Sequence, residues 1–334
     1  RKERRRLFPE ELCILEEERF CFLERGIKMA EKNSARSRSN KKLIFYCAFM
    51  AYPVLQFVIF YLFVNFNSIL LSFKNIDVYD YTKFGWTLDN FTRWFKDPTM
   101  FEQMITAAGV SLKVYLITLV VGVPLGLFFS YYIFKKLPAS GFFRVMLFLP
   151  SILSSIVLVS IYTSFMNNVL ADILKKLFDM DRKIDFFSID RRFATVMFYN
   201  IFIGFATSVL MYANKMSSIS TEVIESAHLD GASGIKEFWY IVLPMSFSTV
   251  SVFLVTGVAG IFTNQINDFI FFGTTPNNET MTLGYLLYVK TYTAKQNMSE
   301  YPTIASLGLM ITAVAVPLTF LVKHLLDKYG PKED

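Results

Sequence analysis

Four polar side chains interrupt an apolar stretch of the chain and are the first candidates for binding chemistry. The segment FTNQINDFIFFG places Asn264, Gln265, Asn267 and Asp268 among hydrophobic residues. In a helix, Asn264 and Asp268 are four residues apart and share one face, as do Gln265 and Asp268. An aspartate at the centre of a bilayer costs about 2.5 to 3.5 kcal/mol, so such groups face protein or water. Either they line a pocket and bind hydroxyl groups, or they hydrogen-bond to a neighbouring helix.

A second polar face precedes this segment. In YNIFIGFATSVLMY, the residues Asn200, Gly204 and Thr207 follow one another at i, i+4 and i+7, which is one side of a helix. Aromatic rings such as Tyr199 and Phe262 lie close in the sequence to these polar groups, and rings of this kind stack on apolar ligand faces.

The elements that must position these groups are long apolar helices. Of the 334 residues 53% are hydrophobic, and a helix needs about 20 apolar residues to cross a bilayer. Each apolar run is continuous rather than alternating, which favours helices over a barrel. The sequence therefore predicts an all-α polytopic membrane protein, and Pro53, Pro124 and Pro150 are expected to kink its helices. The six predicted spans are residues 43–72, 105–134, 142–169, 193–215, 241–272 and 302–326.

A charged, glycine-containing loop lies between the fourth and fifth predicted spans. It reads ESAHLDGASGIKEFWYIVLP. Ser220 or Thr221 is suited to cap a helix that starts near Glu222, and Gly231 and Gly234 are suited to end or bend it. A short amphipathic helix followed by a turn and a second short helix has a shape that fills a cleft on another protein.

This loop resembles the EAA motif of permease subunits of binding-protein-dependent ATP-binding cassette (ABC) importers. The match consists of Glu225-Ser226-Ala227, then Gly231, then Ile241-x-Leu243-Pro244, with Ser226 in place of the commoner alanine. In that family the loop carries a coupling helix that docks in a groove of a cytoplasmic ATPase. The resemblance implies that Glu225 makes a polar contact with the ATPase, that Ala227 permits close approach and that Gly231 makes the turn. The residues assigned to ATPase coupling are Glu225, Ser226, Ala227, Asp230 and Gly231.

The resemblance covers roughly residues 40 to 330 and is closest to sugar-importer permeases of the maltose-transporter type. It implies the type I ABC importer permease fold, with six transmembrane helices. Thr207 stands where the maltose permease has a tyrosine, Asn264 where it has an aromatic residue and Asp268 where it has an amide, so a more polar pocket is expected and maltose is not favoured. The residues that match its sugar-lining positions are Asn200, Gly204, Thr207, Asn264, Gln265 and Asp268.

The resemblance also implies the partners. They are a homologous second permease subunit, two cytoplasmic ATPase subunits, an extracellular solute-binding protein and a sugar. The chain has no Gly-x-x-x-x-Gly-Lys-Ser/Thr, so we expect no cofactor in this chain and ATP-Mg on the partner ATPases. The chain is thus expected to be a transport subunit rather than an enzyme, and closure of the ATPases would rock its spans in alternating access.

Two other transport functions are possible. An ion-coupled secondary transporter would need an inverted repeat and relays of buried ionisable groups, whereas Asp268 is the one clear acid within a predicted span. An importer permease for a non-sugar solute, such as a glycerol phosphodiester, is the second alternative.

Enzymatic, metal and nucleic-acid functions are not favoured. His228 stands alone as a polar residue of the docking surface, and it and His324 lie at cytoplasmic edges. Cys13, Cys21 and Cys47 form no CxxC pair. The net charge of +6 is concentrated beside the spans, where basic residues serve as anchors, so no nucleic-acid partner is expected.

The basic stretch ARSRSNKK before the first span places the N-terminus inside, which predicts a multi-pass protein of the bacterial plasma membrane with both termini in the cytoplasm. The predicted domains are a cytoplasmic segment 1–42, a transmembrane domain 43–326 with a coupling loop 216–240, and a cytoplasmic tail 327–334.

Residues 1–28 differ sharply in composition from the rest of the chain. They are dense in charges of both signs, whereas Met29 opens a short basic lead into the first span. Codons for Leu23 to Gly26 could contain a purine-rich ribosome-binding sequence just before Met29. We therefore expect residues 1–28 to be an over-extended reading frame, and the alternative is an amphipathic cytoplasmic helix.

Overall fold

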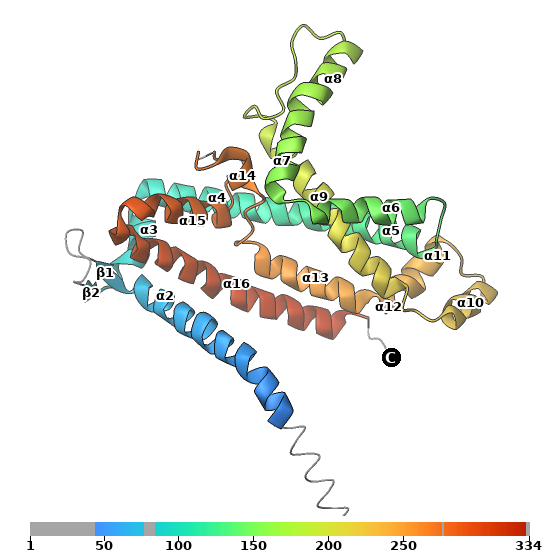
Figure 1. Cartoon of the computed structure of the whole chain (residues 1–334), viewed down its shortest axis with the longest axis horizontal. Helices are drawn as coiled ribbons and strands as arrows, with labels where there is room; N and C mark the ends of the chain where they lie inside the picture. Colours follow the sequence, from blue (N-terminus) through green and yellow to red (C-terminus); the bar gives the residue numbers. More distant parts are fainter. Residues whose placement is uncertain (1–43, 77–83, 276, 332–334) are drawn as a thin grey trace, which may run out of the picture. The chain divides into compact units, whose positions relative to one another are not determined.

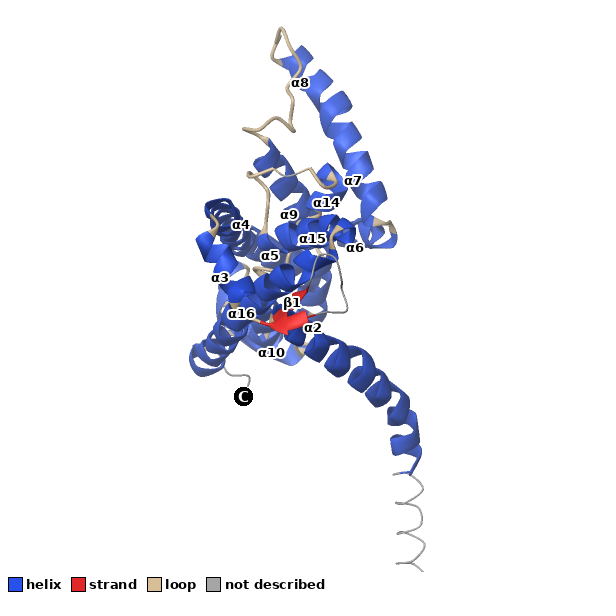
Figure 2. Cartoon of the chain, turned by 90° about the vertical axis from the view of Figure 1, so that its left-hand side faces the viewer, coloured by secondary structure: helices blue, strands red, loops and turns tan. Residues whose placement is uncertain are grey.

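The computed structural model describes residues 44–76, 84–275 and 277–331. The prediction on residues 1–28 and most of the predicted segment 1–42 lie outside these ranges. The chain divides into two compact units, residues 1–68 and 69–334, which are described separately. Almost every described element is a helix, and Figure 2 shows strands only in one hairpin. In that hairpin β1 (Lys74–Ile76) pairs antiparallel with β2 (Phe84–Trp86).

The first unit contributes most of one long apolar helix. It runs from Ile44 to Ser72, with a π-helical segment η1 (Phe57–Phe63) ahead of α2 (Val64–Ser72). At a rise of 1.5 Å per residue, a helix of 29 residues is longer than the roughly 30 Å thickness of the hydrocarbon core of a bilayer. Its side chains are exposed from Ile44 to Ile69, and exposure of a continuous apolar surface fits lipid as the solvent.

The second unit contains the other candidate spans (Figure 1). Four of its helices are long and apolar enough, and a bent pair would give a fifth, so the described chain has five or six candidate spans in all. The predicted six-helix permease fold agrees with this arrangement. The spans of the second unit are Pro98–Phe134, Ser155–Leu177, Arg192–Met216, Met298–Tyr329 and the pair Ile235–Met245 with Phe247–Gly260, which is bent by 68°.

Several of these spans are built from more than one helical segment. The second span comprises α4 (Pro98–Ile117), η2 (Thr118–Gly122) and α5 (Val123–Phe134), and the third comprises α7 (Ser155–Ser164), η4 (Phe165–Leu170) and α8 (Ala171–Leu177). The fourth is α9 (Arg192–Met216). The bent pair comprises α11 (Ile235–Glu237), η5 (Phe238–Val242), α12 (Leu243–Met245) and α13 (Phe247–Gly260), and the last span comprises η7 (Met298–Glu300) and α16 (Tyr301–Tyr329).

Shorter helices connect the spans. They are α3 (Asp89–Lys96), α6 (Ser140–Phe148), η3 (Leu149–Ile152), α10 (Thr221–Leu229), α14 (Asp268–Phe272), α15 (Leu283–Thr293) and η6 (Ala294–Gln296).

The second and third spans begin at different residues from those predicted, for local reasons. The second begins earlier because Asp97 caps it, with Oδ1 accepting from the amide of Thr99 at 2.9 Å, and because Pro98 fits the first helical turn. The predicted third span, 142–169, is wrong at its start. The chain tightens to a 3-10 turn at Pro150, and the spanning helix begins only after Ser154, whose hydroxyl caps it.

The predicted helix 241–272 is also wrong beyond Gly260. Residues 261–267 form turns, and α14 starts at Asp268. Ile266 and Asn267 have φ of 44° and 60°, and the Asn264 side chain accepts the amide of Ile266 at 2.9 Å. Asparagine side chains offer the backbone such local bonds in place of a helix. Contrary to the prediction, Asn264 and Asp268 therefore do not share a helix face.

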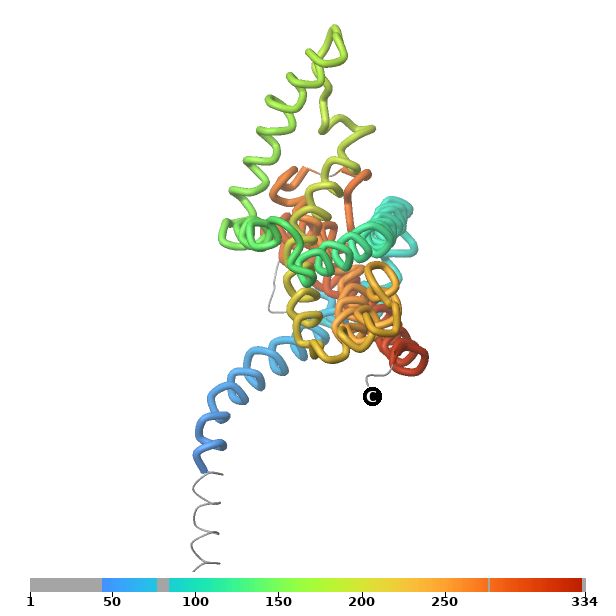
Figure 3. Tube along the Cα trace, turned by 90° about the vertical axis from the view of Figure 1, so that its right-hand side faces the viewer, coloured from blue at the N-terminus to red at the C-terminus, as the bar shows by residue number. Residues whose placement is uncertain are grey.

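Within the second unit, α5 (green in Figure 3) packs closely against α9 (yellow). The Ser130 hydroxyl donates to the Gly126 carbonyl at 2.6 Å and to the Val209 carbonyl at 3.0 Å. A Cβ on Gly126 would lie 3.3 Å from the hydroxyl of Ser208. Small residues at this crossing let the two backbones approach closely, as in other membrane helix pairs.

Candidate functional site

A cavity of about 520 Å³ lies between the second, fourth and fifth spans. Four of the six predicted binding residues line it, namely Asn200, Gly204, Thr207 and Asn264. Gln265 and Asp268 do not. The polar residues around the cavity are Ser111, Tyr115, Thr118, Asn200, Thr207, Ser208, Tyr212, Thr256, Thr263, Asn264 and Thr282.

The side chain of Asn200 forms hydrogen bonds between two parts of the cavity wall. Its Nδ2 donates to the carbonyls of Val196 at 2.9 Å and Ile266 at 2.8 Å, and its Oδ1 accepts from Asn267 Nδ2 at 3.0 Å. These bonds tie α9 to the left-handed turn at residues 266–267. Asn200 thus borders the cavity and links two elements at once, so the two roles considered for these polar residues coincide here.

Asp268 is not among the residues that line the cavity. It is fully buried at the start of α14, outside the spanning helices. The nearby Thr280 hydroxyl donates to Asn277 Oδ1, and neither carboxylate oxygen of Asp268 has a hydrogen-bond partner among the described residues. Burial raises the pKa of the Asp268 carboxyl to about 8. Burial therefore favours the neutral form of this acid.

The second span contributes a wall of the cavity that was not predicted from the sequence. Ser111, Tyr115 and Thr118 line the cavity from α4 and the start of η2. Their spacing of i, i+4 and i+7 marks one helix face, so the signal was present in the sequence. The π-helical turn η2 ends just before Pro124, a residue with no amide hydrogen to give to the helix.

Thr282, the residue that caps α15, also lines the cavity. The Thr282 hydroxyl donates to the Asn264 carbonyl at 2.7 Å, and the Ser111 hydroxyl accepts the amide of Leu283 at 2.9 Å. A Cβ on Gly284 would lie 2.4 Å from the carbonyl oxygen of Thr263. Only glycine allows the helix to approach the 261–267 turn this closely.

The predicted coupling residues lie on and after α10. Glu225, Ser226 and Asp230 are exposed, whereas Ala227 is buried within this chain. Gly231 follows the helix with φ of +81°, a conformation that favours glycine, and its amide donates to the His228 carbonyl at 3.1 Å. The burial of Ala227 shows that its small side chain is needed for packing inside this chain.

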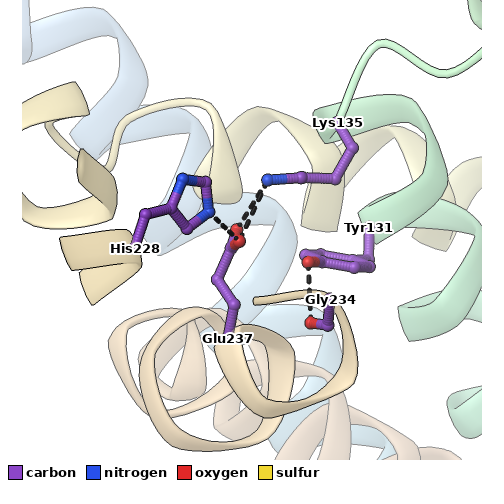
Figure 4. Close-up of polar contacts among 5 residues, drawn as sticks. All are labelled: Tyr131, Lys135, His228, Gly234 and Glu237. Carbon is purple, nitrogen blue, oxygen red and sulfur yellow. Dashed lines mark hydrogen bonds and ion pairs between the residues drawn. The ribbon is translucent and has the colours of Figure 1, made fainter. Parts of the chain in front are cut away.

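A buried carboxylate anchors this segment to the second span (Figure 4). Glu237 is fully buried, and its Oε2 lies 3.0 Å from Lys135 Nζ and 2.7 Å from His228 Nε2. Tyr131 donates its hydroxyl hydrogen to the Gly234 carbonyl at 2.9 Å. The expectation that His228 stands alone is therefore wrong, because its partner comes from the next short helix.

Comparison with known proteins gives a family match over most of the chain. The family model described as "Binding-protein-dependent transport system inner membrane component" matches residues 118–332. The multiple sugar-binding transport system permease protein MsmF of Streptococcus mutans is 25% identical over 264 residues, which cover 79% of this chain and 89% of that protein.

Solved structures show the same fold. The crystal structure of a bacterial ABC transporter involved in import of the acidic polysaccharide alginate matches with a TM-score of 0.72 and 18% identity, covering 88% of this chain and 99% of the other. The structure of the alginate transporter in complex with its alginate pentasaccharide-bound periplasmic protein matches with a TM-score of 0.70 and 18% identity, covering 86% and 96%.

Proposed function

The chain belongs to the family of binding-protein-dependent transport system inner membrane components, and we propose that it is the permease subunit of an ATP-driven importer for neutral sugars or oligosaccharides. The family match confirms the resemblance drawn from the EAA motif. The likeness to MsmF, a multiple sugar-binding transport system permease, supports a sugar as the transported solute.

The composition of the cavity is the observation that carries this proposal. Hydroxyl and amide groups occur together with aromatic rings such as Tyr115 and Phe253 among the residues that line the cavity, and this mixture suits the hydroxyls and the apolar faces of a sugar. No Lys, Arg, Asp or Glu is among the lining residues that the structure describes.

The absence of charged side chains from the described lining favours a neutral sugar. A phosphodiester or a uronate would lose water here without gaining a cation, and burial of an unpaired charge is costly. The cavity thus supports a neutral solute over a glycerol phosphodiester. An acidic polysaccharide, such as the alginate of the solved relatives, would need cationic side chains, and the described lining of this cavity has none.

The energy for transport would come from partner subunits. In this proposal α10 docks in a cytoplasmic ATPase, with Glu225 making the polar contact, and a homologous permease completes the path through the membrane. The docking face also has exposed apolar side chains, since Leu229 is 90% exposed. In this arrangement the N-terminus lies in the cytoplasm. A periplasmic or extracellular protein delivers the sugar, and alternating access moves the sugar across the membrane.

An ion-coupled secondary transporter is less well supported. Such a protein needs ionisable groups on its solute path. Asp268, the acid that the sequence offered for this role, lies outside the cavity lining.

Uptake into proteoliposomes tests the proposed substrate class. The reconstituted complex of this chain with its genomic neighbours should take up neutral oligosaccharides at least ten times faster than uronate oligosaccharides of equal length. Thr207→Trp should reduce that uptake at least tenfold because the larger ring fills the cavity. Phe198→Trp, at an exposed position of the same helix outside the cavity lining, is the matched control. Equal uptake by the Thr207→Trp complex, or faster uptake of uronates, would overturn the assignment.

A further inference from the structure

Glu237 connects two elements that are far apart in the sequence. It belongs to α11, while its partners are Lys135, just after α5, and His228, near the end of α10. The two carboxylate oxygens lie 3.1 Å and 3.0 Å from Lys135 Nζ, so the lysine bridges both (Figure 4). These three residues are called the Glu237 link below.

The charge of Glu237 depends on its partners. The carboxylate is fully buried, whereas the side chains of Lys135 and His228 are 28% and 45% exposed. A buried carboxylate is stable only when charged or polar donors satisfy it, and removal of one donor leaves a charge without compensation. The link therefore constrains α10, α11 and the end of α5 to one arrangement.

A second set of contacts reinforces the same junction. Tyr131 lies one turn before Lys135 on α5 and donates to the carbonyl of Gly234 at 2.9 Å. The ring of Phe238, which is almost completely buried, packs 5.1 Å from the ring of Tyr131 and 5.2 Å from that of Phe128, between ring centroids. The contact is thus both polar and apolar, and a shift of α11 would disturb α5 at several side chains together.

The helix that receives these contacts also lines the cavity. Residues Pro98–Phe134 form one continuous span, and Thr118, Gly122 and Val123 of that span line the cavity. Further along, Gly126 and Ser130 pack against α9, which contributes Asn200 and the other cavity residues of the fourth span. A physical path of packed groups therefore leads from the docking segment to the cavity.

We propose that the Glu237 link is the connection through which the docking segment α10–α11 moves the second span. Lys135, His228 and Glu237 are positioning residues: they hold the docking segment to α5 so that displacement of one is transmitted to the cavity wall. This inference rests on the proposed importer function. It assigns a role to residues outside the EAA positions.

The test compares neutralising and conservative variants in the complete reconstituted complex. The variants Lys135→Gln and Glu237→Gln remove one charge each, while Lys135→Arg keeps the charge. Lys136→Gln is the matched control, since Lys136 is the adjacent, exposed lysine. The readouts are the amount of ATPase subunit that copurifies and the ratio of stimulated to basal ATP hydrolysis. The stimulating probe is the solute-binding protein with a mixture of neutral oligosaccharides, such as arabino- and galactooligosaccharides, which are of the substrate class proposed above.

We expect Lys135→Gln and Glu237→Gln to lower the stimulated-to-basal ratio at least fivefold while the ATPase subunit still copurifies. Lys135→Arg and Lys136→Gln should stay within twofold of wild type. Wild-type ratios in both neutralised variants at equal assembly would overturn the proposal. So would an equal loss in Lys136→Gln, because that would show a general effect of charge.

A distance measurement tests the link without relying on ATP hydrolysis. It therefore remains informative if the variants assemble poorly or if the importer assignment is wrong. Spin labels on exposed Leu229 and Leu137, in a variant without the native cysteines, report the distance between α10 and the segment after α5. Wild type and Lys136→Gln should give one narrow distribution, and Lys135→Gln a broad one. A narrow distribution in Lys135→Gln contradicts the link even when no oligosaccharide stimulates the complex. Absence of stimulation in wild type counts against the proposed function alone.

Discussion

At the scale of single residues, Asp268 is expected to make the stability of the folded protein depend on pH. Its pKa of about 8 lies far above the ordinary value of 3.8, and burial is the cause. Between these two values the folded state binds more protons than the unfolded state. Its contribution to stability is therefore fully present below about pH 4 and is lost as pH rises toward 8.

The corresponding prediction concerns Asp268→Asn. The amide cannot ionise, so the variant should gain stability over wild type as pH rises, by up to about 1.4 kcal/mol for each pH unit between 4 and 8. Thermal unfolding in detergent at pH 5 and pH 8 measures this difference. Asp172→Asn, where the native side chain is 46% exposed and pairs with Lys183, should show no comparable gain. A constant difference between Asp268→Asn and wild type at both pH values would show that the carboxyl is not neutral in the folded protein.

At the scale of elements, α15 approaches the 261–267 turn closely, and Thr263 of that turn lines the cavity. Gly284→Ala places a Cβ 2.4 Å from the Thr263 carbonyl oxygen, so the backbone must shift. We expect a loss of about 1 to 3 kcal/mol in stability and weaker uptake. Gly109→Ala is the matched control, because a Cβ there meets nothing within 4 Å. Thermal unfolding compares the two variants, and equal stability would contradict the close approach.

The elements also show what the sequence could predict. Continuous apolar runs located the spans, because a bilayer needs about 20 apolar residues in a helix. They did not reveal that the fifth helix ends at Gly260, since this depends on local bonds such as that between Asn264 and the Ile266 amide. The spacing of Ser111, Tyr115 and Thr118 was available and would have identified a third wall of the cavity.

The Glu237 link shows a limit of a different kind. Lys135 and Glu237 are separated by 102 positions, and no periodicity relates residues on different helices. Motif matching identified Glu225 and Gly231 from spacing within a single loop. The pairing between that loop and α5 appears only in the folded chain, where the ring of Phe238 packs against the ring of Tyr131.

At the scale of the whole molecule, the second span both lines a cavity without charged side chains among its described residues and contacts the docking segment α10–α11 through Glu237. In the proposed importer, α10 couples this chain to an ATPase. Sugar-stimulated ATP hydrolysis in proteoliposomes measures this coupling. The comparison is between wild type, Glu225→Lys and the control Glu102→Lys, an exposed charge reversal on α4, at equal amounts of permease.

We predict that Glu225→Lys abolishes stimulation and loosens the ATPase subunit, because reversal of an exposed docking charge removes its polar contact, while Glu102→Lys leaves both unchanged. Unchanged docking and stimulation in Glu225→Lys would contradict the coupling role of α10 and reopen the case for an ion-coupled transporter.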